Sequence, residues 1–279
     1  MTKKYRFEKS PSLHMKSYNK AKNPLVSIIT VCYNSEKTIA KTIESVLNQT
    51  CSNLEYLIID GLSTDGTLDI IQRYEPKFKG RLKWISEKDA GIYDAMNKGI
   101  NFVKGQIVGI INSDDWYELN TVELVVNSYR TYGEGVHYGI LRIMENGVEV
   151  MLKVVNYRFL YREDVGHAAY FVASNIYRTY GIFKTDYRFA SDFELMMRYI
   201  QNNVHFIQIN NILATFNREG LSTQHNLETW EEYLRIRYKF GYLTKYELFL
   251  RIVKYKLLRT VRKYSGVYTK VLKYLFIKN

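Results

Sequence analysis

Short apolar runs alternate with stretches of helical spacing from residue 24 onward. Four runs rich in β-branched residues are typical of buried strands, and they are Leu25–Val31, Tyr56–Ile59, Leu82–Ile85 and Gln106–Ile111. Between them, apolar residues recur every three or four positions and predict helices over Ile39–Leu47, Leu68–Tyr74 and Ile92–Val103, with Ser35 placed to cap the first. This alternation predicts an α/β fold in which helices flank a mostly parallel sheet.

The second half of the chain is less regular. Val136–Ile143 and Val148–Val154 flank an Asn-Gly pair, which is a strong hairpin signal. Residues 156–190 are rich in Tyr, Phe and Arg and predict few clear elements. Ser191 and Glu194 have the spacing of a capping box, so a helix is expected to begin there. Two short strands are then expected, His205–Ile209 and Ile212–Phe216.

Basic helices rich in aromatic residues are expected near the C-terminus. They are Leu227–Phe240, Glu247–Val261 and Val267–Ile277. Each helix has one face of Lys and Arg and an opposite face of Tyr, Leu and Phe. This arrangement is typical of helices that lie on an anionic membrane surface, although a basic outer face on a packed helix is the alternative. The expected parts of the chain are a basic lead-in at 1–23, an α/β catalytic domain at 24–222 and a membrane-proximal helical extension at 223–279.

The composition limits the class of protein. Apolar residues make up 46% of the 279, enough for a buried core, and the net charge of +12 favours anionic partners without choosing among them. Cys32 and Cys51 match no zinc or redox spacing, so buried free thiols in a reducing compartment are expected. The N-terminus lacks the apolar core of a signal peptide, and no apolar run is long enough to span a membrane, so a cytoplasmic location is expected.

Carboxylates stand where the predicted strands end. Asp60 follows the second strand, and Asp114 and Asp115 follow the fourth. Ligands of open α/β sheets bind outside the carboxyl ends of the strands, and Asp oxygens suit a Mg²⁺ or Mn²⁺ ion that bridges to substrate phosphates. The structural alternatives are that Ser113 and Asp114 cap a helix, and that the loop Asp60–Gly66 does the same instead of lining a nucleotide pocket.

Three further positions have both a structural and a chemical interpretation. Asp94 can pair with Lys98 one helical turn later, or the segment Asp89–Gly99 around it can contact nucleotide or sugar hydroxyls. Asp192 follows the predicted cap, where it can complement the helix dipole or accept a proton from an attacking hydroxyl. His167 is a lone histidine, which is structural or binds a ligand.

Four segments, in this order, resemble those of glycosyltransferase family two. They are Val26–Asn34 (VSIITVCYN), Asp60–Thr67 (DGLSTDGT), Asp89–Gly99 (DAGIYDAMNKG) and Asn112–Asp115 (NSDD). Within that family the chain is similar to bacterial enzymes that build surface polysaccharides, the colanic-acid and O-antigen glycosyltransferases. The resemblance covers residues 24–222 and implies a GT-A fold and sugar transfer with inversion at the anomeric carbon.

The resemblance also implies roles for individual residues. Asp192 matches the general base, Asp114 matches the position that binds Mn²⁺ or Mg²⁺, and His167 matches a histidine that contacts acceptor or diphosphate. The matched donor-binding positions are Thr30, Tyr33, Asn34, Asp60, Asp89, Asp94, Asn112, Ser113 and Asp115, with Asp60 at the nucleotide base. Gly220–Ser222 resembles a late loop over the donor, and Asn112 departs from the family's aspartate and is a weaker cation ligand.

The resemblance implies a nucleotide-sugar donor, by default a UDP-sugar, and a role in O-antigen or capsule synthesis. The basic C-terminal helices favour a lipid-linked saccharide acceptor, and the expected setting is the anionic inner face of the cell membrane. A nucleic-acid-binding protein would need a recognisable motif, so no nucleic acid partner is expected. A sugar-phosphate nucleotidyltransferase would need a glycine-rich basic segment early in the chain, which is absent. A catalytically silent relative that binds sugar nucleotides or acts as a scaffold remains an alternative.

Overall fold

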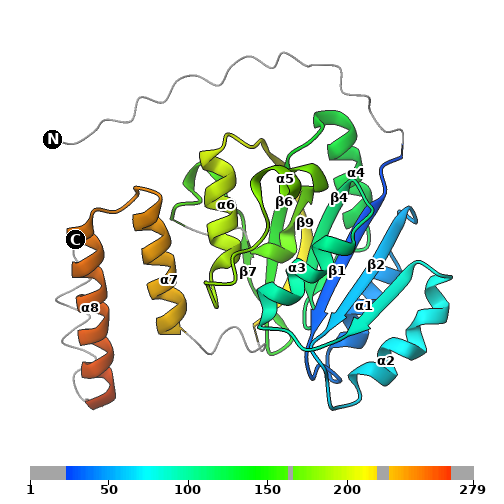
Figure 1. The fold of residues 1–279 in the computed structure, drawn as a ribbon, viewed down its shortest axis with the longest axis horizontal. Helices are drawn as coiled ribbons and strands as arrows, with labels where there is room; N and C mark the ends of the chain where they lie inside the picture. Colours follow the sequence, from blue (N-terminus) through cyan, green and yellow to red (C-terminus); the bar gives the residue numbers. More distant parts are fainter. Residues whose placement is uncertain (1–22, 163–165, 219–225, 265–279) are drawn as a thin grey trace.

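The computed structural model describes residues 23–162, 166–218 and 226–264. Within these ranges, nine strands form one sheet in the order β3-β2-β1-β4-β8-β6-β9-β5, and β7 pairs with β6 (Figure 1). The strands are β1 (Val26–Cys32), β2 (Leu54–Asp60), β3 (Leu82–Ser86), β4 (Ile107–Asn112), β5 (Trp116–Tyr117), β6 (Val136–Glu145), β7 (Val148–Lys153), β8 (Tyr170–Ala173) and β9 (Phe206–Asn217). The predicted fold class is confirmed, because β3, β2, β1 and β4 are parallel neighbours.

Helices cover both faces of this sheet. They are α1 (Ile39–Leu47), α2 (Thr67–Tyr74), α3 (Ile92–Phe102), α4 (Thr121–Tyr132), α5 (Ser174–Tyr180), α6 (Ser191–Gln201), α7 (Asn226–Lys239) and α8 (Lys245–Tyr264), with short 3₁₀ helices η1 (Glu75–Phe78), η2 (Tyr157–Phe159) and η3 (His167–Ala169). Successive residues of a strand point to opposite faces. Ile28 therefore shares a core with α1, α2 and α4, whereas Ile29 shares a core with α3, α5 and α6.

Two antiparallel strands close the other half of the sheet around β6. β8 pairs with both β4 and β6, and thereby joins the parallel half to the rest. The predicted hairpin is confirmed as β6 and β7. The two short strands expected after residue 204 form the single strand β9, which follows β6 in parallel with register shifts near Ile140. Those shifts let one long strand keep its pairing where the sequence pattern is interrupted.

Both predicted N-caps are wrong. α1 begins at Ile39, and the amides of Thr38 and Ile39 donate to the carbonyl of Ser35, not to its hydroxyl. Ser191 is the first residue of α6, and its hydroxyl accepts the amide of Lys184 at 2.8 Å instead of capping the helix. In both places a partner outside the helix competes for the serine, and the local spacing does not reveal that partner.

The aromatic stretch 156–190 has more structure than the sequence predicts. It contains β8 and α5, and α4 was also not expected. α7 and α8 agree with two of the three expected C-terminal helices, and α8 stands on the far side of α7 from the sheet (Figure 1). The lead-in up to residue 22, the loop Gly220–Ser222 and the helix Val267–Ile277 lie outside the described residues. No helix in the described ranges is long and apolar enough to cross a membrane.

A fully buried histidine joins α4 to the sheet. His137 of β6 lies 2.7 Å from the hydroxyl of Ser128 through Nδ1 and 3.0 Å from the carbonyl of Gly133 through Nε2. The carbonyl can only accept, so Nε2 carries the proton and Nδ1 accepts from the serine. This arrangement uses the neutral ring, and burial lowers the pKa of His137 from 6.5 to about 4.

This histidine predicts acid sensitivity of the fold. The unfolded ring takes up a proton near pH 6.5 and the folded ring only near pH 4, so stability that is complete above pH 6.5 is lost as pH falls between the two values. We expect a loss of about 2 kcal/mol between pH 7.5 and pH 5 from this group. Urea unfolding at both pH values measures it, and His137→Gln should lack that part of the pH dependence. Equal pH dependence in the two proteins would contradict the assignment.

Candidate functional site

Parallel pairing brings the ends of three strands to one edge of the sheet. Cys32 at the end of β1 is paired with Asp60 at the end of β2, and Val31 is paired with Asn112 at the end of β4. The loops that follow these strands therefore leave the sheet side by side. They carry Tyr33 and Asn34 after β1, the segment 61–66 after β2, and Ser113 to Asp115 after β4.

Hydrogen bonds join the three loops. The side-chain oxygen of Asn34 accepts the backbone amide of Thr64 at 2.8 Å, and the backbone amide of Asn34 donates to the hydroxyl of Ser63 at 2.8 Å. Asn34 adopts a left-handed backbone conformation, φ 48°, which asparagine tolerates. The hydroxyls of Ser35 and Ser113 lie 2.8 Å apart, so the loop after β1 also contacts the loop after β4. The loops therefore form one connected surface.

Asp60 holds the loop that follows it. Its carboxylate accepts the amide of Ser63 at 3.0 Å, the hydroxyl of Ser86 at 2.6 Å and the hydroxyl of Ser63. The side chain is fully buried. The thiol of Cys32 also donates to it at 3.5 Å, so the structure gives Asp60 four donors within the protein, and the expected contact with a nucleotide base remains a prediction.

An exposed aromatic ring and a carboxylate flank this loop. Tyr33 is 58% exposed. Gly61 lies between Tyr33 and Asp89, since a Cβ on Gly61 would stand 2.6 Å from the Oδ2 of Asp89 and 3.5 Å from the ring of Tyr33. A larger residue here would require the Asp89 carboxylate to move away from the loop. A ring and an acid side by side can stack on a base and accept hydrogen bonds from its sugar.

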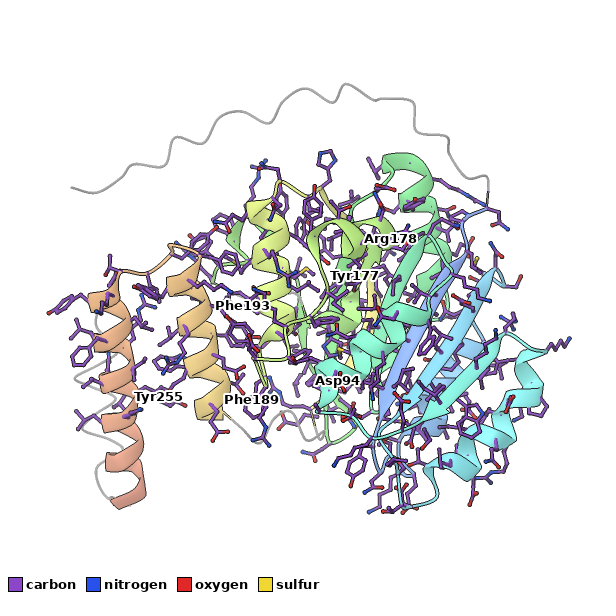
Figure 2. All side chains as sticks on the ribbon, in the orientation of Figure 1. Asp94, Tyr177, Arg178, Phe189, Phe193 and Tyr255 are labelled. Atoms are coloured by element: carbon purple, nitrogen blue, oxygen red, sulfur yellow. The ribbon has the colours of Figure 1, made fainter. Side chains whose placement is uncertain are left out.

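Some of the predicted donor-binding residues have partners within the protein. Thr30 is fully buried and accepts the hydroxyl of Tyr56 at 2.9 Å, so it supports the sheet from inside rather than facing a ligand. Asp94, labelled in Figure 2 near the start of α3, accepts the amide of Ala90 at 3.0 Å and pairs with Lys98 at 3.7 Å. These contacts are the structural alternative that the sequence left open for Asp94.

The turn after β4 concentrates oxygen atoms that lack donors. Burial raises the pKa of Asp114, and burial together with the charge of Asp114 raises that of Asp115 well above its usual range. Asp115 is fully buried and its Oδ1 accepts the amide of Asn217 at 3.0 Å, so it ties the turn to β9. Its Oδ2 and the Oδ1 of Asn112 are buried and receive no hydrogen bond from any part of the chain that the structure describes.

This oxygen set fits a hard divalent cation. Mg²⁺ and Mn²⁺ take oxygen ligands, and a cation beside Asp114 and Asp115 would favour their ionised forms. Across the described ranges, no group of three or more His, Cys, Asp or Glu side chains comes together to hold a metal. The protein would therefore supply Asp114 and few other ligands, and the remaining positions would fall to diphosphate and water oxygens.

Asp192, in the first turn of α6, is joined to α3 by a hydrogen bond. The hydroxyl of Tyr93 donates to its Oδ1 at 3.1 Å, and the amide of Phe193 donates to the same oxygen at 2.8 Å. The Nδ1 of His167 lies 3.9 Å from its Oδ2, and these two side chains are 15% and 13% exposed. Burial, followed by the charge of Asp192, raises the pKa of Tyr93 well above its usual range, so the phenol keeps the proton that it donates.

Sequence reasoning did not single out Tyr93. Its apolar spacing within α3 matches a core position, and only the tertiary structure brings its hydroxyl to α6. Asn97, one turn further along α3, forms two hydrogen bonds with the backbone of Phe183, at 2.9 and 3.0 Å. The segment Asp89–Gly99 therefore connects the strand-end loops to the chain that leads into α6.

Comparison with known proteins agrees with this arrangement. The model of glycosyl transferase family 2 matches residues 27–187. The "PGL/p-HBAD biosynthesis glycosyltransferase" of Mycobacterium bovis (strain BCG / Pasteur 1173P2) is 27% identical over 209 residues, which are 71% of this chain and 78% of that protein.

Two solved structures share the fold at low sequence identity. S. aureus TarS 1-349 in complex with UDP superposes with a TM-score of 0.62 at 20% identity, over 76% of this chain and 64% of that chain, just under two thirds. Mannosyltransferase PcManGT from Pyrobaculum calidifontis, in complex with GDP-Man and Mn²⁺, superposes with a TM-score of 0.63 at 15% identity, over 91% and 79% of the two chains.

The family match includes the loops after β1, β2 and β4, Tyr93 and His167, and ends just before Asp192. It covers more than half of the 279 residues. From the sheet edge, its loops and this match, we conclude that the chain belongs to glycosyl transferase family 2 and is a glycosyltransferase with the GT-A fold.

Proposed function

We propose that this glycosyltransferase inverts the anomeric carbon and transfers a sugar from a nucleotide-sugar donor to a hydroxyl of a lipid-linked saccharide, in the synthesis of a cell-surface polysaccharide. A UDP-sugar is the default donor. The observation that carries the proposal is the hydrogen bond from Tyr93 to Asp192 at 3.1 Å, because it joins the helix after the donor-side loops to the carboxylate assigned as base.

Asp192 is suited to accept a proton. Its Oδ1 is occupied by Tyr93 and the amide of Phe193, while Oδ2 lies toward His167. In the proposed step Oδ2 takes the proton of the acceptor hydroxyl, the acceptor oxygen forms a bond to the sugar C1, and the bond from C1 to the diphosphate oxygen breaks with its electron pair. A single displacement of this kind inverts C1. Holding both substrates at one site removes much of the entropic barrier.

Asp114 is the residue proposed to hold a Mn²⁺ or Mg²⁺ ion. Support comes from its desolvated carboxylate and from the unfilled acceptors of Asn112 and Asp115 beside it. A bound cation would neutralise charge on the departing diphosphate. Tyr33, Asn34 and Asp89 are proposed to contact the donor, since they lie at the same edge.

The proposed acceptor and the membrane setting rest on α8. Its apolar residues form a stripe that stays exposed, with side-chain positions one turn apart; they are Tyr246 (70%), Phe249 (63%), Leu250 (45%), Val253 (45%) and Leu257 (60%). Lys245, Arg251 and Lys254 of the same helix are exposed beside it. An apolar stripe flanked by cations is what binds an anionic lipid surface, where a lipid-linked acceptor would be held. The proposed location is therefore the inner face of the cell membrane.

The alternative proposal, a silent relative that binds sugar nucleotides without turnover, predicts binding without nucleotide release. It is favoured only by Asn112, which replaces an expected acidic ligand. The first experiment below separates the two.

Replacing Asp192 should stop the reaction without removing the donor. Asp192→Asn keeps an oxygen for Tyr93 and Phe193 but cannot take a proton, so we expect turnover to fall on the order of 10²–10⁴-fold with donor affinity within about twofold. Nucleotide release from a panel of UDP- and GDP-sugars with Mn²⁺ measures turnover. The control is Asp186→Asn, an exposed aspartate in the loop before α6. Full turnover by the Asp192 variant would refute the base, and no release by the wild type with any donor or acceptor would favour the silent relative.

Replacing Asp114 should raise the concentration of Mn²⁺ that turnover requires. We expect EDTA to abolish nucleotide release and Mn²⁺ to restore it, and Asp114→Asn to need at least about tenfold more Mn²⁺ because one charged ligand is lost. The control is Asp69→Asn, on the exposed side of α2. Wild-type turnover that is insensitive to EDTA would exclude the cation from the mechanism.

The exposed stripe of α8 should carry membrane binding. We expect the protein to pellet at low salt with vesicles that contain phosphatidylglycerol. The double variant Phe249→Ser, Leu257→Ser should bind about tenfold more weakly, because it removes two apolar side chains that would be buried in the membrane interface. The control is the double variant Phe102→Ser, Leu119→Ser, which removes two similarly exposed apolar side chains (56% and 62%) outside α8. Equal binding by the two double variants, or none by the wild type, would contradict the proposal.

A further inference from the structure

α7 packs against the helix that carries Asp192. Ile236 of α7 shares a small core with Ala190, Phe193 and Met197 from the start and body of α6. The rings of Phe193 and Tyr233 lie 4.6 Å apart, and Figure 2 shows Phe193 on the side of α6 that faces α7. α7 is therefore in direct contact with the base-bearing helix, although the sequence assigns it to a separate C-terminal extension.

A carboxylate of α7 caps α6 from outside. The Oε1 of Glu232 accepts the amide of Arg188 at 2.8 Å, and its Oε2 accepts the amides of Phe189 and Ala190 at 2.8 and 2.9 Å. Ala190 is the N-cap residue of α6 and has no side-chain cap of its own. Glu232 thus binds three consecutive amides that end where the helix begins, and it supplies the negative charge that a helix N-terminus favours.

The same two helices are tied together by a second charged contact. Lys239 near the end of α7 lies 3.2 Å from the Oε1 of Glu194, a fully buried residue of α6. Burial alone would raise the pKa of Glu194, but hydrogen bonds and charges from Arg198, Lys239 and Lys184 outweigh it, so the pKa is lowered and the group is a carboxylate. The start of α6 is therefore held to α7 by Glu232 and its first turn by Lys239.

Asp192 is held by contacts from two helices. The hydroxyl of Tyr93 of α3 donates to its Oδ1, and Glu232 of α7 accepts the backbone amides two to four residues before it. A small shift of a base relative to its substrate can cost a large factor in rate. The Glu232 carboxylate on the three amides, together with the Ser191 hydroxyl that accepts the amide of Lys184, holds the path of the chain into Asp192.

We infer that Glu232 is a positioning residue for Asp192, and that the catalytic unit extends through α7 instead of ending between residues 222 and 223. The inference rests on the proposed role of Asp192 as base. By this inference α7 belongs to the catalytic unit, and α8, beyond the turn at Gly241, is the helix proposed to bind the membrane.

The test compares two adjacent glutamates of α7 in the full chain. Glu232→Gln places an amide donor against the amides of residues 188–190, and Glu232→Asp keeps the charge but shortens the reach. The matched control is Glu231→Gln, because Glu231 pairs with Arg235 and Lys256 on the side of α7 toward α8. For each protein, kcat and donor KM are measured by nucleotide release with the preferred sugar nucleotide and Mn²⁺, and thermal unfolding is followed by circular dichroism.

We expect Glu232→Gln to lower kcat by about 10- to 100-fold with donor KM changed by less than about threefold, because the donor side belongs to β1, β2 and β4. Glu232→Asp should fall between that variant and the wild type, and Glu231→Gln should match the wild type. If Glu232→Gln does not fold, the ordering of kcat for the aspartate variant and the control still decides the question.

Two results would overturn the inference. One is a folded Glu232→Gln variant with kcat within about twofold of the wild type, while Asp192→Asn remains inactive. The other is an equal loss in kcat and in donor affinity that follows the loss of thermal stability, which marks a general structural role. Full turnover by Asp192→Asn would instead refute the proposed base, whatever the Glu232 variants do, so the two failures are distinguishable.

Discussion

The in-register parallel pairing of β2, β1 and β4 is the constraint on which the rest of the structure depends. Because Cys32 is opposite Asp60 and Val31 is opposite Asn112, three strands end at the same level and release three loops at one edge. Helices on both faces bury β1 fully and all but one residue each of β2 and β4, so a shift in the pairing would expose apolar side chains. The polar side chains at this edge then need only short loop hydrogen bonds, such as Asn34 to Thr64, to reach a common surface.

Helix α3 connects the sheet to Asp192. α3 lies close to β1, where a Cβ on Gly99 would stand 2.6 Å from the Cγ2 of Ile29, so glycine sets how near the helix approaches the sheet. From that position Tyr93 and Asn97 reach the chain around α6. The donor side and the base side of a glycosyltransferase must keep a fixed separation, and a helix packed tightly on the sheet provides it.

The contacts that sequence reasoning missed share one physical cause. Ser191 has the spacing of a capping residue, yet its hydroxyl accepts the backbone amide of Lys184. Glu232, about forty residues later in the chain, accepts the amide of the N-cap residue Ala190. Thr30 and Asp115 match donor-binding positions, and each also has a partner on another strand, Tyr56 and Asn217, that the motif does not reveal. A motif identifies a residue type at a place in the chain, but the competing partners arrive only when the chain has folded.

The sequence by itself determined the alternation of strands and helices, the acidic residues at the strand ends and the family, because these depend on local periodicity and on short motifs with few structural solutions. Only the tertiary structure decided that the middle of the aromatic stretch 156–190 becomes β8 and α5, and that Tyr93, His167 and Glu232 gather around the start of α6. Those contacts join residues far apart in the sequence, and their energy depends on burial and packing that no local pattern records.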